Sequence, residues 1–184
     1  RDFGVDIEFS GAPAGLADND GFLGYVLGET GAVVADYFYF DHTTEASPYD
    51  SPTLHIADLT GDLQVPVAPG LLMNTPTIAS QARFRGFINN QMDADGALRR
   101  APLLIGHHDV LHPNLALATV MRAMGVSRAT VSTSREGPFI EFGNRRVPID
   151  AVGAAVLQFN GPPDRYPTVS ARDVINGAID DTDL

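Results

Sequence analysis

Residues 83–105 read RFRGFINNQMDADGALRRAPLLI, two strand-like runs separated by an acidic turn. The two runs are Arg83–Gln91 and Ala97–Ile105, and both carry several large apolar side chains. Asp95-Gly96 stands between them, and tight hairpin turns favour Asp-Gly because glycine accepts a positive φ without strain. We therefore predict an antiparallel hairpin at this point, with Gly96 at positive φ.

The two carboxylates beside this turn raise the alternative of a metal site. Asp93-x-Asp95-Gly96 has the spacing at the start of a calcium-binding loop. Such a loop would place Gln91 at the first ligand position and Pro102 where a bidentate glutamate belongs. Because neither residue has a carboxylate, we interpret Asp93, Asp95 and Gly96 as structural turn residues. We predict no metal and no cofactor.

Arg99 and Arg100 follow the turn and are candidates for binding an anionic ligand. A guanidinium group matches the geometry of carboxylate and phosphate. Alternation along a strand sends neighbouring side chains to opposite faces of the sheet. The pattern therefore predicts that one of the two arginines contacts a ligand while the other pairs with an acidic side chain.

Outward from this hairpin, strands and helices are interleaved along the chain, as in mixed α/β folds. The expected strands are Phe3–Phe9, Ala32–Phe40, a short element near Leu54–Leu59, Ala129–Ser134, Pro138–Phe142, Arg145–Ile149 and Ala154–Asn160. The first expected helix runs from a cap at Asp18 or Asp20 to about Glu29, and a short second helix covers Thr77–Ala82. The third covers Leu115–Met124, with Pro113 as a first helical residue. The fourth runs from a cap at Ser170 to near Gly177. We predict an α/β fold: a mixed sheet with at least one antiparallel hairpin, flanked by helices, in a single domain over residues 1–184.

Composition excludes several classes of function. The chain lacks cysteine and lysine, which excludes thiol catalysis, disulfides, zinc–cysteine sites, Schiff-base chemistry and the lysine of a phosphate-binding loop. A formal net charge of −11 without tryptophan argues against a nucleic-acid partner. No apolar run reaches the length of a membrane span, and no signal peptide is visible.

Gly21, Gly24 and Gly28 form a stripe at helical spacing within the first predicted helix. Glycine weakens a helix, so such a stripe indicates that another backbone approaches closely. Two occupants are possible: another part of the same domain, or the same helix of a second subunit in a homodimer.

His107, His108 and Asp109, with His112 close by, are the residues that most resemble a catalytic or metal-binding cluster. Two histidines four residues apart bind zinc when they share a helix. Pro113 follows this segment and begins the next helix, so we expect the histidines in a strand end or turn. Solvated loop histidines are therefore the favoured interpretation, with ligand binding by His107 and His108 as a tentative alternative.

Several ordered segments together resemble the type-2 CHASE domain, the cyclase- and histidine-kinase-associated extracellular sensory domain. One part of the resemblance is the run Asp93-x-Asp95-Gly96-x-x-Arg99-Arg100-x-Pro102-Leu103-Leu104 with His112-Pro113-Asn114-Leu115-Ala116-Leu117-Ala118. Another is Val156-Leu157-Gln158-Phe159-Asn160-Gly161-Pro162-Pro163, followed by Tyr166-Pro167-Thr168-Val169-Ser170-Ala171-x-Asp173-Val174-Ile175-x-Gly177. A third is Phe3–Phe9 with Asp20-x-x-Leu23 and Val33-Val34-Ala35. The resemblance spans nearly the whole chain.

The resemblance implies the extracytoplasmic sensory domain of a bacterial membrane receptor with a nucleotide cyclase or histidine kinase output. Family members usually open with a further strand and helix and are flanked by transmembrane helices. We therefore expect this chain to be a soluble piece of a larger receptor. The implied partners are an unknown small molecule or periplasmic protein, the receptor's own transmembrane and output domains, and a second copy. No catalytic residue is implied, so we expect the chain itself not to be an enzyme.

Two other classes of function stay open from the sequence. One is a stand-alone periplasmic hydrolase or metal-binding protein that uses His107, His108 and Asp109. The other is a structural spacer that binds no ligand.

Overall fold

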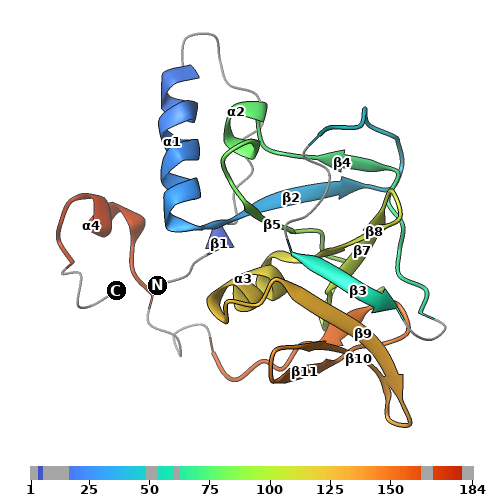
Figure 1. The fold of residues 1–184 in the computed structure, drawn as a ribbon. Helices are drawn as coiled ribbons and strands as arrows, with labels where there is room; N and C mark the ends of the chain where they lie inside the picture. Colours follow the sequence, from blue (N-terminus) through green and yellow to red (C-terminus); the bar gives the residue numbers. More distant parts are fainter. Residues whose placement is uncertain (1–3, 6–16, 49–53, 60–62, 163–167, 180–184) are drawn as a thin grey trace.

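The computed structural model describes residues 4–5, 17–48, 54–59, 63–162 and 168–179. Its first sheet is built around β2 (Val33–Tyr39), a strand rich in β-branched and aromatic residues. β1 (Gly4–Val5) and β5 (Phe84–Phe87) run parallel to β2, and β4 (Gly70–Leu72) runs antiparallel to it (Figure 1). The remainder of the predicted strand Phe3–Phe9 lies outside the described residues.

Helices α1 (Ala17–Thr30) and α2 (Pro76–Ala79) pack together beside this sheet (Figure 1). Their apolar contacts join Leu27 to Ile78, Ala82 and Val34 in one buried cluster. α1 begins at Ala17, so Asp18 and Asp20 lie inside the helix, and the prediction that one of them caps it is wrong. The helix ends at Thr30, close to the predicted end near Glu29, and Gly31 follows it at φ +65°.

The glycine stripe of α1 faces α2 within the same chain. A Cβ on Gly24 would lie 3.2 Å from the carbonyl oxygen of Thr77, and a Cβ on Gly28 would lie 2.9 Å from that of Gln81. Gly21 faces open space. Of the two occupants that the sequence allowed, the domain's own backbone therefore covers the stripe at Gly24 and Gly28.

The second sheet has the order β11-β10-β9-β3. Its strands are β3 (His55–Leu59), β9 (Arg128–Ser134), β10 (Gly137–Phe142) and β11 (Arg145–Pro148). β9, β10 and β11 form successive antiparallel pairs, and β3 runs parallel to β9.

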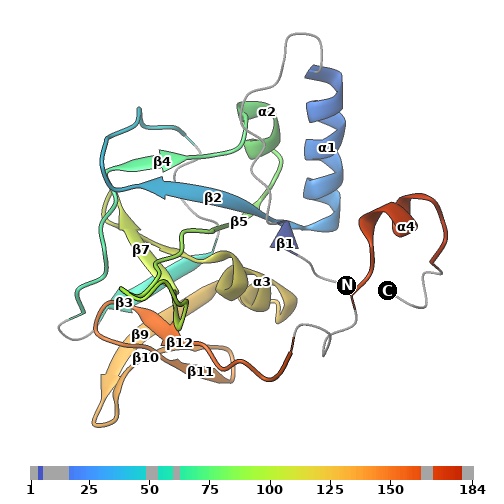
Figure 2. The ribbon, with the colours of Figure 1, turned by 180° about the vertical axis from the view of Figure 1, so that it is seen from behind.

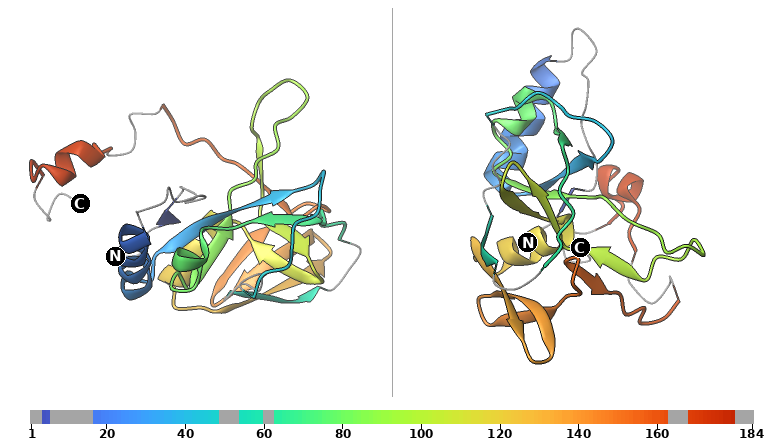
Figure 3. Two further views of the ribbon diagram at one scale, coloured as in Figure 1. Left: turned by 90° about the horizontal axis from the view of Figure 1, so that it is seen from above. Right: turned by 90° about the vertical axis from the view of Figure 1, so that its right-hand side faces the viewer.

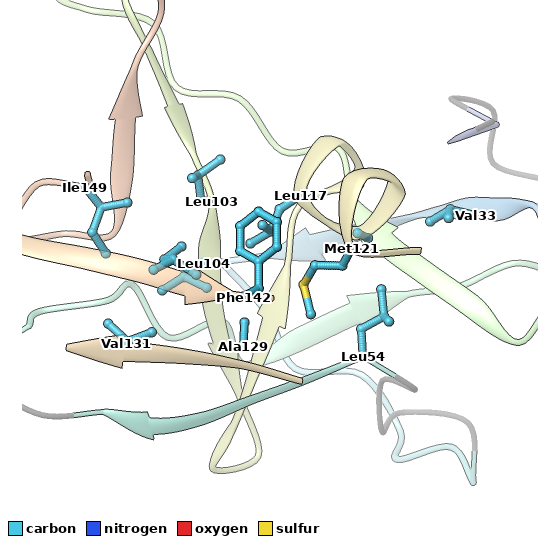
Figure 4. Packing of buried hydrophobic residues seen from close by; sticks show 12 residues of the cluster. Val33, Leu54, Leu103, Leu104, Leu117, Met121, Ala129, Val131, Phe142 and Ile149 are labelled. Carbon is cyan, nitrogen blue, oxygen red and sulfur yellow. The ribbon is translucent and has the colours of Figure 1, made fainter. Parts of the chain in front are cut away.

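Helix α3 (Leu115–Ala123) lies between the two sheets and buries Leu117 and Met121 in the main core (Figure 4). The core also contains Val33 of the first sheet and Val131 and Phe142 of the second, so α3 connects the two sheets through side-chain packing.

The start of α3 differs from the prediction. Pro113 closes a strand, and Asn114 is the N-cap, whose side chain accepts a hydrogen bond from the Leu117 N–H at 2.8 Å. Asn114 also hydrogen-bonds through its backbone N–H to the Leu103 carbonyl, which draws Pro113 into the preceding strand rather than into the helix.

Two short antiparallel pairs complete the fold. β6 (Arg100–Pro102) pairs with β12 (Ala154–Val156), and β7 (Leu104–His107) pairs with β8 (Val110–Pro113) (Figure 2). The predicted pairing of Arg83–Gln91 with Ala97–Ile105 is therefore wrong. β5 ends at Phe87 in a parallel pair with β2, and β6 pairs with a strand about fifty residues further along the chain.

The segment between β5 and β6 projects from the body of the protein (Figure 3). We call residues 88–99 the projecting loop. Its tip is the predicted turn, with Gly96 at φ +79°. Two backbone hydrogen bonds close the tip, from Gly96 N to Asp93 O at 2.8 Å and from Asp93 N to Ala97 O at 2.9 Å.

α4 (Ala171–Ile175) follows Ser170 and lies apart from the two sheets, with no buried residue (Figures 1 and 3). Overall the structure is a mixed α/β fold whose sheets include the antiparallel hairpins β7–β8, β9–β10 and β10–β11, which confirms the predicted class. In the part of the chain that the structure describes, no helix combines the length and the apolar character needed to cross a bilayer.

Candidate functional site

The predicted histidine cluster lies on the β7–β8 hairpin, and its residues have very different environments. His107 ends β7 and His112 lies in β8, with exposed fractions of only 2% and 4%. His108 and Asp109 form the exposed turn between the strands. The prediction of a strand end or turn is therefore confirmed, but the expectation that His107 and His112 are solvated is wrong. These two side chains face the core because both strands pack against the first sheet.

His107 is fixed in a single orientation. Its Nδ1 lies 2.8 Å from the carbonyl oxygen of Ala68, so Nδ1 carries the proton and donates this hydrogen bond. The His108 ring packs over the His107 ring with 4.0 Å between centroids, and the Phe38 ring lies 5.6 Å from it. His107 therefore has the contacts of a core aromatic residue.

His112 is buried among groups that disfavour its protonation. Burial is the largest cause, and together with the neighbouring His107, Arg85 and His108 it lowers the pKa of His112 to about 3. The Phe38 ring packs against it edge-on at 5.0 Å. At neutral pH His112 is therefore an uncharged imidazole.

Arg85 belongs to a buried ion pair that the sequence did not reveal. Its Nη1 lies 3.5 Å from Asp36 Oδ2, and both side chains are at most 5% exposed. Nη1 also lies 2.6 Å from the sulfur of Met73. Asp36 and Arg85 occupy neighbouring strands in the middle of apolar runs, so no periodicity marks them as a pair.

The β7–β8 turn has an unusual backbone. His108 and Asp109 have φ values of +45° and +60°, in the left-handed region that non-glycine residues seldom occupy. Two successive residues with positive φ are typical of a tight two-residue hairpin turn, because the twist of such a turn matches the twist of the strands that it joins. A hollow of about 480 Å³ lies beside this turn. Its lining residues are Ile56, Val67, Gly106, His107, Asp109, Val110 and Leu111.

The turn does not gather the side chains that the hydrolase or metal-binding alternative requires. Among the described residues, no three histidine, aspartate or glutamate side chains converge as a metal site would need. Of the three residues in that alternative, His107 is buried and bonded to a backbone carbonyl, whereas His108 and Asp109 are exposed.

Arg99 pairs with the two carboxylates of the projecting loop. Its Nη1 lies 2.9 Å from Asp93 Oδ2 and its Nη2 lies 2.8 Å from Asp95 Oδ2. The hydrogen bond from Arg99 lowers the pKa of the Asp95 carboxyl, and the two carboxylates raise the pKa of Arg99. The Arg99 guanidinium therefore links Asp93 and Asp95 across the turn, and these contacts give Arg99 a structural role.

Arg100 has a looser arrangement. Its Nη1 lies 3.4 Å from Asp150 Oδ2, and the side chain is 60% exposed. It lines a hollow of about 390 Å³ together with Met92, Asp93 and Asp150. Both arginines therefore lie beside acids, and of the two Arg100 is the one that borders a hollow. Ligand binding by either arginine stays a prediction.

A third hollow was missed by the sequence reasoning. It lies between the end of β2 and the base of the projecting loop and has a volume of about 380 Å³. It is bordered by Tyr37, Phe40 and three successive amide residues, Asn89-Asn90-Gln91. The three amides at the end of the predicted run Arg83–Gln91, and the aromatic residues at the end of the predicted strand Ala32–Phe40, were the signals available in the sequence.

The projecting loop, the hairpins and both ends of the described chain all fall within the match to a single domain family. The CHASE2 domain family matches the chain over residues 4–184. A search of curated proteins finds no match, and a search of solved structures finds none either. The family match covers nearly the whole sequence and includes every element described above. The chain therefore belongs to the CHASE2 domain family, a family of extracellular sensory domains.

Proposed function

We propose that this chain is the ligand-sensing part of a bacterial transmembrane receptor whose output domain is a nucleotide cyclase or a histidine kinase. The observation that carries the proposal is the family match over residues 4–184. The three hollows around the projecting loop and the β7–β8 turn support it, because each has the volume of a small-molecule site.

In this proposal, the chain binds but does not catalyse. A ligand or periplasmic partner changes signalling only if it binds one arrangement of the receptor more tightly than the other. A difference of a few kcal/mol is enough to reverse the population of two such arrangements. The receptor acts as a homodimer in which this change alters the packing of the membrane helices.

The location is tested by topology reporters on the full-length gene product. Alkaline phosphatase fused directly after Ile175 is expected to be active, because this enzyme matures outside the cytoplasm, whereas β-galactosidase at the same point is expected to be inactive. The opposite pattern would overturn the extracytoplasmic placement.

The output is tested in membranes that contain the full-length product. We expect either cyclic nucleotide formation or transfer of phosphate to histidine, and we expect deletion of residues 4–179 to change the regulation of that activity. Neither activity in a product that is correctly inserted would contradict the proposed receptor.

The spacer alternative has its own test. In a thermal-shift screen of the isolated chain against metabolites and anions, a ligand that binds the folded state raises the melting temperature with the logarithm of its concentration above Kd. A shift that grows with ligand concentration in this way supports the sensory role, whereas no shift across the screen favours a spacer.

A further inference from the structure

The hollow beside β2 is a candidate for a ligand site, and we call it the amide hollow. Its volume of about 380 Å³ falls within the range of small-molecule sites. Its lining residues are Tyr37, Phe40, Pro66, Asn89, Asn90, Gln91, Pro102 and Ile105.

The lining of the amide hollow contains no charged side chain. This is notable in a chain whose formal net charge is −11. The neighbouring hollow, which shares Gln91 with it, is bordered by Asp93, Arg100 and Asp150. A charged ligand in the amide hollow would lose hydration without gaining an opposite charge, so the lining favours a neutral ligand.

Two aromatic rings give the hollow apolar surfaces that are already exposed. Tyr37 is 39% exposed and Phe40 is 51% exposed. The Tyr37 ring is held edge-on by Tyr39 at 5.5 Å, and Tyr39 packs in turn against His42 at 4.1 Å. Because this row of rings fixes Tyr37, its surface is available to a ligand without rearrangement.

The amide groups of the lining can supply hydrogen bonds to a ligand. Asn90 and Gln91 are exposed, and neither side chain bonds to another residue that the structure describes. Asn89 anchors them, because its own amide holds the backbone of Phe38 at both N–H and C=O. A primary amide donates and accepts at adjacent atoms, which suits a partner with neighbouring hydroxyl groups.

We propose that the amide hollow binds a neutral, polyhydroxylated small molecule of the sugar class. A sugar ring offers an apolar C–H face to Tyr37 and Phe40 and a rim of hydroxyls to Asn90 and Gln91. The inference rests on the proposed sensory function and deepens it by naming the ligand class, but the binding itself is measured on the isolated chain.

The test uses ligand-observed NMR and calorimetry with defined probes. The neutral probes are glucose, galactose, N-acetylglucosamine, maltose and cellobiose, and the charged probes are glucuronate and glucosamine. We expect saturable binding of at least one neutral probe, and we expect glucuronate and glucosamine to bind at least tenfold more weakly than that probe.

The variants locate the site. Tyr37→Ala and Gln91→Ala are each expected to weaken binding at least tenfold. Phe22→Ala is the matched control, because Phe22 is an aromatic residue that is 71% exposed on α1 outside the hollow, and it is expected to bind as the unchanged chain does. If Tyr37→Ala lowers the melting temperature, Asn90→Ala replaces it and is likewise expected to weaken binding at least tenfold, since Asn90 is exposed and lies outside β2.

Three outcomes would overturn the inference: no saturable binding of any neutral probe, binding that survives Tyr37→Ala and Gln91→Ala, or binding of a neutral, blocked hexapeptide in place of every sugar. None of them bears on the topology and output experiments, so a failure here is distinguishable from a failure of the receptor proposal.

Discussion

The side-chain amide of Asn89 closes two hydrogen bonds on the backbone of Phe38, accepting from its N–H and donating to its carbonyl, each at 2.8 Å. The β2–β5 ladder ends at the pair Asp36–Phe87, so Asn89 continues the attachment of the two strands after their backbones diverge. Phe38 in turn packs its ring against His107 and His112. One amide thus joins the base of the projecting loop to the buried aromatic cluster.

Removing this amide should destabilise the fold. Asn89→Ala leaves the N–H and carbonyl of Phe38 without their partners, and each partly buried group that loses its bond costs about 1 kcal/mol or more. We therefore expect the free energy of unfolding to fall by about 1–3 kcal/mol in urea denaturation. Asn90→Ala is the control, because Asn90 is exposed and should change stability by no more than about 0.5 kcal/mol. Equal effects of the two variants would contradict this account.

Gly28 and Gly21 give a matched pair of substitutions in one helix. In Gly28→Ala the new Cβ meets the backbone oxygen of Gln81 at 2.9 Å, a contact that only a backbone shift relieves. We expect Gly28→Ala to destabilise the chain by about 1–3 kcal/mol. Gly21→Ala meets nothing within 4 Å and should stabilise by up to about 1 kcal/mol through helix propensity. Thermal melts of both variants measure this, and a stabilised Gly28→Ala would show that the backbone at Gln81, just after α2, does not limit this face.

The elements with strong local signals were predictable from the sequence. The strand β2, the helix α3 and the turn at Asp95-Gly96 follow from β-branched and aromatic content, amphipathic spacing and the demand for positive φ. What failed was the choice of partners. β6 pairs with β12 rather than β5, because pairing depends on packing between segments far apart in the chain, which no local pattern records.

In the candidate site, too, local arrangements were predictable from the sequence and arrangements that depend on distant segments were not. Solvated loop histidines were predicted because Pro113 was taken as the start of the helix, but His112 and Pro113 belong to β8, and its pairing with β7 places His107 and His112 in a buried hairpin. The amide hollow has walls from four separate segments, residues 37–40, 66, 89–91 and 102–105, so only the tertiary fold brings its residues together. Arg99 beside Asp93 and Asp95, in contrast, is a local arrangement within seven residues.

The backbone at Gly96 predicts the cost of adding a side chain there. Its φ of +79° disfavours β-branched residues, and a Cβ would meet no atom within 4 Å, so the effect isolates backbone strain from steric contact. We expect Gly96→Val to cost about 1 kcal/mol or more in chemical denaturation. Gly96→Asn should cost less, since asparagine tolerates positive φ. A Gly96→Val protein as stable as the unchanged chain would refute the turn geometry.

His112 predicts how stability depends on pH. Its pKa is lowered to about 3 in the folded chain from 6.5, so between these values the unfolded chain binds more protons than the folded one. This contribution to stability is fully present above pH 6.5 and decreases as the pH falls toward 3. The slope is small at pH 7 and approaches about 1.4 kcal/mol per pH unit near pH 5, so the free energy of unfolding in urea should fall by about 2 kcal/mol in total between pH 7 and pH 5. The titratable and charged groups that face the ring are Arg85, His107 and His108.

His112→Leu separates this titration from that of the carboxylates. The buried Nε2 of His112 has no hydrogen-bond partner among the described residues, so an apolar side chain of similar size should change stability at pH 7 by less than about 1.5 kcal/mol. Between pH 7 and pH 5 the variant is expected to lose most of the slope, because few carboxylates titrate in that range. His108→Leu, at an exposed position, is expected to keep the slope. An unchanged slope in His112→Leu would show that another group governs the acid sensitivity of the fold.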